Sequence, residues 1–222
     1  MVAIYNQYFY QPLLDLFHFI FNNIAFHDLG LAIVLLTIFI RLILFPLFYR
    51  GIKDQLLVKK IQPRIKEIQS KYKNDKAEQT KALMALYKEH KFNPFSGFLV
   101  LIVQLPILIA LFQIFGKGLD AGGIDSFLFL GLIDLRSPYL FLTLITAVLQ
   151  YFQMKMLTVL HKEKASEPAD VMHSVGKTMV YVSPVITFMI LANLRAAMAV
   201  YWAVSTLFSI GQQQLVKKRL MA

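Results

Sequence analysis

The sequence has no cysteine among its 222 residues, and its five histidines are scattered along the chain. Without a thiol, the chain cannot form a disulfide, a thiolate metal site or a lipidated N-terminal cysteine. The histidines lack the spacing of metal ligands, and no glycine-rich phosphate loop, nucleophile elbow or pair of carboxylates is visible. The sequence therefore offers no recognisable machinery for an enzyme, a metal ion or a small-molecule cofactor.

Acidic residues are also few, with 13 Asp and Glu against 23 Lys and Arg, which gives a net charge of +10. A charge of this sign can indicate nucleic-acid binding, but basic residues interleaved with aromatic ones on a folded surface are missing. The cationic residues instead gather between long apolar stretches. This pattern is typical of a membrane protein, whose cytoplasmic loops are enriched in Lys and Arg.

The start of the chain lacks the basic residues of a secretory signal, and its apolar stretch is interrupted by Pro12, Asp15 and His18. We therefore expect the mature protein to begin at or near Met1. Within the N-terminal outer segment, residues 1–28, large apolar residues recur at helical spacing between positions 8 and 23. This periodicity predicts an amphipathic helix on the outer membrane surface.

Hydrophobic residues make up 57% of the chain and the mean hydropathy is +0.57, which is too apolar for a water-soluble surface. A membrane span needs about 20 mostly apolar residues. We predict an all-α membrane protein with five transmembrane helices. The expected spans are residues 29–49, 95–116, 139–157, 178–194 and 196–215. The last two arise from one long apolar block that is interrupted around Asn193.

The orientation follows from the twelve Lys and Arg residues of segment 50–93, which place that segment in the cytoplasm. Alternation then puts the loop 158–177 and the basic tail 216–222 in the cytoplasm and the loop 117–138 outside. The N-terminus is expected outside and the C-terminus in the cytoplasm.

Two apolar stripes at helical spacing in segment 50–93 predict a pair of antiparallel helices, a cytoplasmic helical hairpin. Asp75 with Glu78 three residues later is typical of a capping box that opens the second helix. Asn93-Pro94 is expected to end that helix, because the residue before a proline is pushed out of the helical region. An ordinary solvated loop without a binding role remains the alternative.

Arg41 is the most informative residue, because charged residues inside spans are rare and usually face a protein interior or a wet cavity. At about 1.5 Å per residue, it lies about 13 Å inside the boundary at Arg50. No acidic residue occurs in any expected span. We expect Arg41 to meet water, lipid phosphate or an acidic group of a substrate; snorkelling to the headgroups is the alternative. Thr37 lies one turn earlier on the same helical face.

Other polar residues recur in the later spans, among them Gln104 and Gln150. Hydrogen bonds between helices would account for them without any functional role. Trp202 fits either the aromatic belt at the membrane interface or the lining of a pocket, since it falls about seven residues into its expected span.

In their order along the chain, these features resemble the YidC/Oxa family of membrane protein insertases. The motifs that carry the resemblance are Thr37-Ile38-Phe39-Ile40-Arg41, Phe45-Pro46-Leu47, Asn93-Pro94-Phe95, Gln104-Leu105-Pro106-Ile107, Ser137-Pro138-Tyr139 and Tyr201-Trp202. The resemblance implies a hydrophilic groove within the bilayer, open to the cytoplasm and to lipid and closed to the outside. Arg41 would be its central charge, and the matching groove positions are Thr37, Gln104, Gln150 and Trp202.

The same resemblance implies a mechanism and partners. Arg41 would attract acidic residues in the tail of a nascent membrane protein, and partitioning of the client's apolar span would complete insertion without ATP. In the bacterial plasma membrane, the hairpin would receive clients, the ribosome or the Sec translocon. Its candidate contact residues are Arg50, Lys53, Lys59, Lys60, Arg64 and Lys66. The basic tail could contact ribosomal RNA through phosphates.

Two other functions would also use an arginine inside a span. A channel or small-solute transporter needs a polar path, but it also needs an exit on the outer side, and no internal repeat is visible. A non-catalytic assembly scaffold would use Arg41 as a structural or lipid contact, and should tolerate its replacement by alanine.

Overall fold

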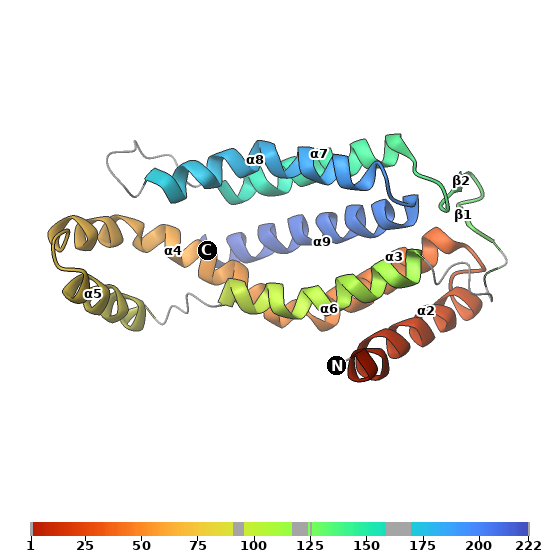
Figure 1. Cartoon of the computed structure of the whole chain (residues 1–222), viewed down its shortest axis with the longest axis horizontal. Coiled ribbons are helices and arrows are strands. Elements are labelled where there is room, and N and C mark those ends of the chain that lie inside the picture. Colours follow the sequence, from red (N-terminus) through yellow and green to blue (C-terminus); the bar gives the residue numbers. More distant parts are fainter. Residues whose placement is uncertain (1, 91–95, 117–123, 125, 159–169, 222) are drawn as a thin grey trace.

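Helices make up most of the chain in the computed structural model, which describes residues 2–90, 96–116, 124, 126–158 and 170–221 (Figure 1). The helical elements are α1 (Val2–Tyr5), the π-helical turn η1 (Asn6–Tyr10), α2 (Gln11–Asn23), α3 (Leu29–Ile43), α4 (Phe45–Lys71), α5 (Lys76–Glu89), α6 (Ser96–Gly116), α7 (Leu140–Thr158), α8 (Asp170–Leu191) and α9 (Ala196–Met221). Two short strands, β1 (Leu128–Phe129) and β2 (Ile133–Asp134), pair antiparallel. The predicted all-helical class agrees with this architecture.

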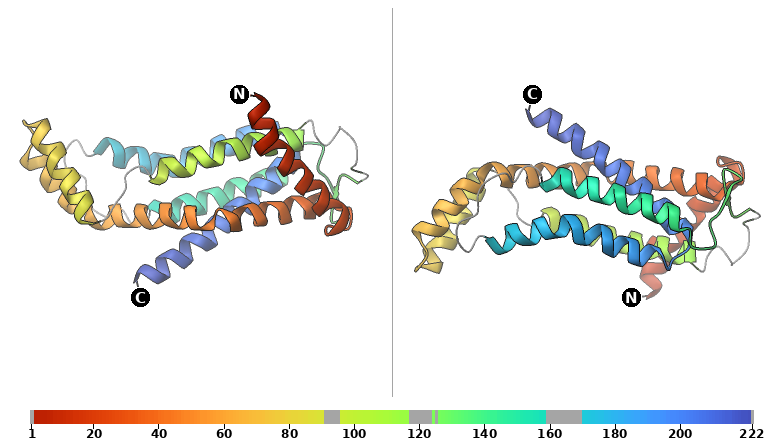
Figure 2. Two further views of the ribbon diagram at one scale, coloured as in Figure 1. Left: turned by 90° about the horizontal axis from the view of Figure 1, so that it is seen from below. Right: turned by 90° about the horizontal axis from the view of Figure 1, so that it is seen from above.

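Helix α9 lies between the α7–α8 pair and α3, and it packs against both α3 and α7 (Figure 1). Its first turns bury the small residues Ala196, Ala197, Ala199 and Ala203. Small side chains allow helix backbones to approach closely, so α9 can serve as the central helix. It continues through the basic tail to Met221, and its C-terminal end projects past the neighbouring helices (Figure 2).

The apolar core is concentrated where α2, α3, α6 and α9 meet. Phe17 of α2 is fully buried, with its ring centroid 5.8 Å from that of Phe115 in α6. Ile20 and Phe21 share this buried face, and α2 contacts both α3 and α6. The α2 part of the apolar stripe expected to lie on the membrane surface is thus covered by protein, while Phe9 before α2 and Phe19 on its other side are exposed.

The predicted first span, residues 29–49, contains a break. Helix α3 ends at Ile43, and α4 begins at Phe45 with a bend of 63°. Pro46 explains the position of the break, because it has no N–H to donate to the carbonyl of Leu42 and disfavours helical geometry in the residue before it. Among the described residues, α3 and the Phe45–Asp54 part of α4 together have the length and hydropathy of a membrane span, and no single helix has both.

The segment between the first two apolar regions forms two helices, α4 and α5, at one end of the molecule (Figure 1). The predicted N-cap at Asp75 is confirmed, since its carboxylate accepts a hydrogen bond of 3.0 Å from the backbone N–H of Glu78. The reciprocal half of the predicted capping box is not formed, because the N–H of Asp75 donates to the carbonyl of Tyr72 and the Glu78 side chain pairs with Lys81. Arg64 of α4 pairs with Glu89 of α5 at 3.4 Å, which indicates that the helices run side by side in opposite directions. Helix α5 ends at Glu89, and the stop predicted at Asn93-Pro94 lies outside the described residues.

The opposite end of the molecule is held together by Asp28. One of its carboxylate oxygens caps α3 through the N–H of Leu31 at 2.8 Å, and the other accepts the N–H of Leu130 at 2.5 Å in the loop between the two strands. The Leu135 carbonyl, just after β2, accepts the N–H of Ala197 in the first turn of α9 at 3.2 Å. The starts of α3 and α9 are therefore joined through the strand pair.

The strand pair also explains a glycine in the first turn of α3. Gly30 is buried, and a Cβ atom at this position would overlap the ring of Phe129 in β1. Only glycine permits this close approach of the helix to the strand pair.

We expect Gly30→Ala to lower the free energy of unfolding by about 1–3 kcal/mol, because the added methyl group overpacks this contact. Gly211→Ala is the matched control, since Gly211 is an exposed position of α9 with open space around its Cβ position. There, alanine should leave the protein unchanged or more stable. Denaturation in detergent micelles measures both, and equal stabilities for the two variants would contradict the proposed contact.

Candidate functional site

Arg41 of α3 reaches across to the central helix α9. Its Nε and Nη2 atoms both donate hydrogen bonds to the hydroxyl oxygen of Ser205, at 2.9 and 2.6 Å. The ring of Phe48, in α4 beyond the bend, lies 4.7 Å from the guanidinium carbon, a cation–π distance. Three helical segments therefore position this one charge.

No described acidic side chain forms an ion pair with Arg41. The described ion pairs lie elsewhere, in the α4–α5 hairpin, within α5 and in the outer loop. The third guanidinium nitrogen, Nη1, is buried and has no hydrogen-bond partner among the described residues. Leaving a buried donor without an acceptor costs about 1–3 kcal/mol. An anionic group that reached Nη1 would remove this cost, so the site is suited to receive a carboxylate or a phosphate.

Thr37 lies one turn before Arg41 and is almost completely buried, at 1% exposure. Its hydroxyl donates to the carbonyl of Ile33 in its own helix at 2.6 Å. This local bond satisfies the hydroxyl proton and leaves only an acceptor lone pair for other groups. The sequence places Thr37 on the same helical face as Arg41, but its hydroxyl donates its hydrogen bond within helix α3.

Gln104 joins the same region from helix α6. Its side-chain amide donates a hydrogen bond of 2.8 Å to the hydroxyl of Tyr201 on α9. Tyr201 lies one turn before Ser205, so α6 and α3 both contact one face of α9. The amide oxygen of Gln104 is buried without a partner among the described residues.

Gln150 and Trp202 are brought together on the other side of α9. The Gln150 side-chain oxygen accepts from the indole N–H of Trp202 at 3.4 Å and from the hydroxyl of Thr206 at 3.5 Å. Because Trp202 and Thr206 are four residues apart, they present one face of α9 to α7. Trp202 is half-buried here and packs against the core, which favours the interior location over the interfacial belt.

The candidate cations of the α4–α5 hairpin are mostly accessible. Arg50, Lys53, Lys60 and Arg64 are exposed, and Lys66 is half-buried. The side chain of Lys59 lies outside the described set. These residues are in α4, which runs toward the end of the molecule opposite the strand pair (Figure 1), and none of the described contacts of Arg41 involves them.

Sequence reasoning did not single out Ser205, Tyr201 and Phe48 as site residues. A signal for the first two was present, since polar residues recur at four-residue intervals through Tyr201, Ser205 and Ser209 in an apolar helix. That spacing places them on one face of α9. Phe48 carried no such signal, because its contact with Arg41 spans the bend between α3 and α4.

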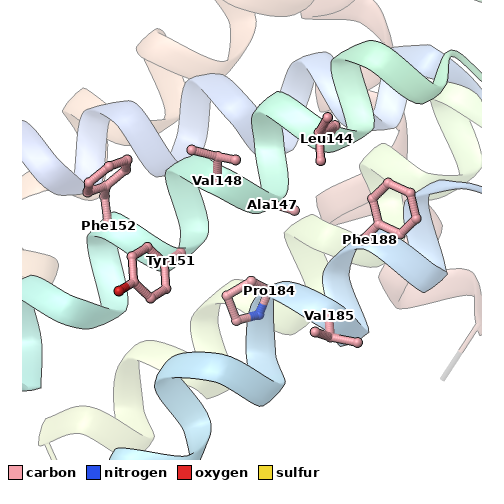
Figure 3. Close-up of a pocket in the computed structure, with 8 residues that line it drawn as sticks. All are labelled: Leu144, Ala147, Val148, Tyr151, Phe152, Pro184, Val185 and Phe188. Atoms are coloured by element: carbon pink, nitrogen blue, oxygen red, sulfur yellow. The ribbon is translucent and has the colours of Figure 1, made fainter.

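An apolar cavity of about 370 Å³ lies between α7 and α8 (Figure 3). It is lined by Leu144, Ala147, Val148, Tyr151, Phe152, Pro184, Val185 and Phe188. None of the residues predicted for a hydrophilic groove is among them. This cavity is therefore separate from Arg41 and from the residues that contact it, Ser205 and Phe48.

Comparison with known proteins gives one family. The family model described as "60Kd inner membrane protein" matches residues 20–222. The chain is 34% identical to a membrane protein insertase YidC of Clostridium tetani, over 86% of this chain and 83% of the relative. It is 32% identical to the YidC insertase of Fusobacterium nucleatum, over 96% of this chain and 98% of the relative.

Other similar proteins are longer than this chain. A YidC insertase of Syntrophus aciditrophicus is 32% identical over 94% of the chain, which spans 36% of that relative's length. A crystal structure of an active YidC insertase, with its first transmembrane domain resolved, superposes with a TM-score of 0.63 at 28% identity. The match covers 93% of this chain and 45% of that one.

Trp202 is the only tryptophan, so its fluorescence reports on the contact between α7 and α9. We expect Gln150→Leu to shift its emission to shorter wavelength, because the indole loses a polar partner, and to lower stability by about 1 kcal/mol. Gln113→Leu is the control, since Gln113 is an exposed glutamine of α6. An unchanged spectrum in Gln150→Leu would mean that the two side chains do not meet.

Proposed function

We propose that this chain, which belongs to the 60Kd inner membrane protein family, inserts membrane proteins into a bacterial plasma membrane. The YidC insertases described above are its relatives. The observation that carries this proposal is Arg41, a cation held between apolar helices with no acidic partner among the described residues. Such an arrangement suits a site whose anionic partner arrives with a substrate and then leaves.

We place the apolar helices across the bilayer as five spans, with the N-terminus outside and the C-terminus in the cytoplasm. Large hydrophobic residues exposed on α6, α7 and α8 support this placement, including Leu105, Phe112, Phe141, Leu144, Phe152, Val185 and Met189. Apolar surface of this extent indicates contact with lipid or protein. The exposed cations of α4 and α5 lie at one end of the helices, as the positive-inside rule requires of a cytoplasmic hairpin.

The proposed groove contains Arg41, Thr37, Gln104, Gln150 and Trp202 on the helices around α9. The pairing of Gln104 with Tyr201 and of Gln150 with Trp202 supports a polar surface that continues along both sides of α9. Its outer end would be closed by the strand pair, through the bonds from Asp28 and Leu135.

Whether Arg41 would trap its client or release it depends on two free energies: the cost of placing a carboxylate in the membrane and the gain from its contact with Arg41. A carboxylate at the centre of a span costs about 3 kcal/mol, and a hydrogen bond to a charged group contributes about 1.5–3 kcal/mol. Arg41 would therefore offset most of the cost of an acidic tail without binding it tightly. An apolar client span of about 20 residues gains about 6 kcal/mol or more in lipid. Partitioning of that span would outweigh the Arg41 contact, so insertion would need no ATP.

We assign reception of the client to the α4–α5 hairpin, with the Sec translocon and the ribosome as further partners. Its exposed cations in α4 would attract acidic protein surfaces or ribosomal RNA phosphates. The exposed Lys217, Lys218 and Arg219 at the end of α9 would add to such contacts. Few apolar residues hold the hairpin in place, Ile61 and Leu86 among the buried ones, so it would move easily to dock a partner.

Arg41→Ala should reduce insertion of a client with an acidic translocated tail by about tenfold, because a charge-assisted contact worth about 1.5 kcal/mol or more is lost. Arg41→Lys should retain part of the activity, since the positive charge survives while the planar fork is lost. Insertion is measured in insertase-depleted bacteria by protease protection of the tail.

Arg136→Ala serves as the control, because Arg136 is an exposed arginine of the outer loop and pairs with Asp134. It should insert the acidic-tailed client at the wild-type rate. Full activity of Arg41→Ala would keep the insertase function and remove Arg41 from the centre of the mechanism.

Replacing residues 65–88 with a short Gly-Ser linker should impair insertion several-fold while the chain itself still integrates into the membrane. Arg64 and Glu89 are suitable ends for the linker, because their side chains meet at 3.4 Å. Growth of the depleted strain and membrane extraction with alkali measure the two effects.

The control inserts the same linker at residues 73–75, in the exposed turn between α4 and α5. Insertions at exposed turns are usually tolerated, so this variant should support growth. A strain that grows equally well with both variants would show that residues 65–88 are dispensable.

A further inference from the structure

The hydrogen bonds of Arg41 divide its guanidinium into two edges. A guanidinium can bind a carboxylate through either of two donor pairs, Nε with Nη2 or Nη1 with Nη2. Ser205 accepts from Nε and Nη2, at 2.9 and 2.6 Å, and so occupies the first edge. The second edge contains Nη1, which is buried and has no partner among the described residues.

The position of Ser205 is fixed by its surroundings. It is 5% exposed and lies in α9, the helix that packs against both α3 and α7. One turn earlier, Tyr201 is held by Gln104 of α6 at 2.8 Å. The hydroxyl that Arg41 meets therefore belongs to a well-supported part of the central helix.

The flat face of the guanidinium is covered as well. The Phe48 ring centroid lies 4.7 Å from its central carbon, on the far side of the bend between α3 and α4. With one edge and one face in contact with protein, the side chain cannot rotate freely. The remaining edge points in one defined direction.

We propose that Ser205 is a positioning residue, which holds the Nε and Nη2 edge of Arg41 so that the Nη1 and Nη2 edge is presented to a client carboxylate. This inference rests on the proposed insertase function and adds a geometric requirement to it. The substrate chemistry is an Asp or Glu side chain, or a terminal carboxylate, bound end-on by two donors. A lysine at position 41 has no fork to orient, so Ser205 would matter little beside it.

The test uses two clients that differ only in the charge of the translocated tail. One has an acidic tail, and in its twin each Asp and Glu is replaced by Asn and Gln. Insertion is followed in insertase-depleted cells with Ser205→Ala, Ser205→Thr and Ser209→Ala, at matched expression of the full chain. Ser209→Ala is the matched control, because it removes the same group from the same face of α9 without touching Arg41.

Ser205→Ala should lower insertion of the acidic-tailed client roughly tenfold, as expected when a hydrogen bond to a charged group is lost. Insertion of the neutral twin should change less than about twofold, within the range of packing effects alone. Ser205→Thr retains the hydroxyl and should restore most of the activity. In an Arg41→Lys background, Ser205→Ala should have a smaller effect than in the wild type.

Each contrary result has one meaning. Equal losses for the two clients would show that Ser205 only stabilises the helix packing, and would overturn the positioning role. A full effect of Arg41→Ala with none from Ser205→Ala would overturn it too, while leaving the insertase function in place. Equal effects of Ser205→Ala beside arginine and beside lysine would also overturn it. Normal insertion of the acidic-tailed client by Arg41→Ala would instead remove Arg41 from the proposed mechanism on which the inference rests.

Discussion

The guanidinium of Arg41 sets the central constraint on this structure. Among the described residues it has no acidic partner, and it is held by the Ser205 hydroxyl and the Phe48 ring. A buried ion pair would satisfy this charge permanently, whereas a hydroxyl accepts hydrogen bonds without neutralising it. The side chain is therefore ordered and still charged, which is the condition for attracting an anion that must later be released.

Helix α9 makes this arrangement possible. Its buried alanines let α3 and α7 approach, and its polar residues face two directions. Tyr201 and Ser205 meet the helices on one side, and Trp202 and Thr206 meet Gln150 on the other. Polar groups in such a helix are costly unless they have partners, so their pairing also fixes how α9 is rotated between its neighbours.

The two ends of the molecule differ in how firmly they are held. At the strand pair, the Asp28 carboxylate and the Leu135 carbonyl join the starts of α3 and α9 by accepting backbone N–H groups, and the aromatic core lies close by. At the other end, the α4–α5 hairpin buries few apolar side chains and includes an exposed ion pair between Arg64 and Glu89. An exposed pair contributes only about 0–1 kcal/mol, so this end opens more easily. The difference suits a molecule whose proposed entrance lies on the hairpin side.

The sequence by itself determined the helical class, the N-cap at Asp75 and the family resemblance. It also determined that Arg41 is a charge in a span and that the expected spans have no acidic residue. These features depend on composition, periodicity and local hydrogen bonding. Pro46 marks a position where the first expected span can kink, but the sequence did not determine the 63° bend, or the burial of the α2 stripe against α3 and α6. Nor did it assign Ser205 and Phe48 to Arg41. Those contacts join residues up to 164 positions apart, and only the packing of α9 between its neighbours decides which side chains meet across such a distance.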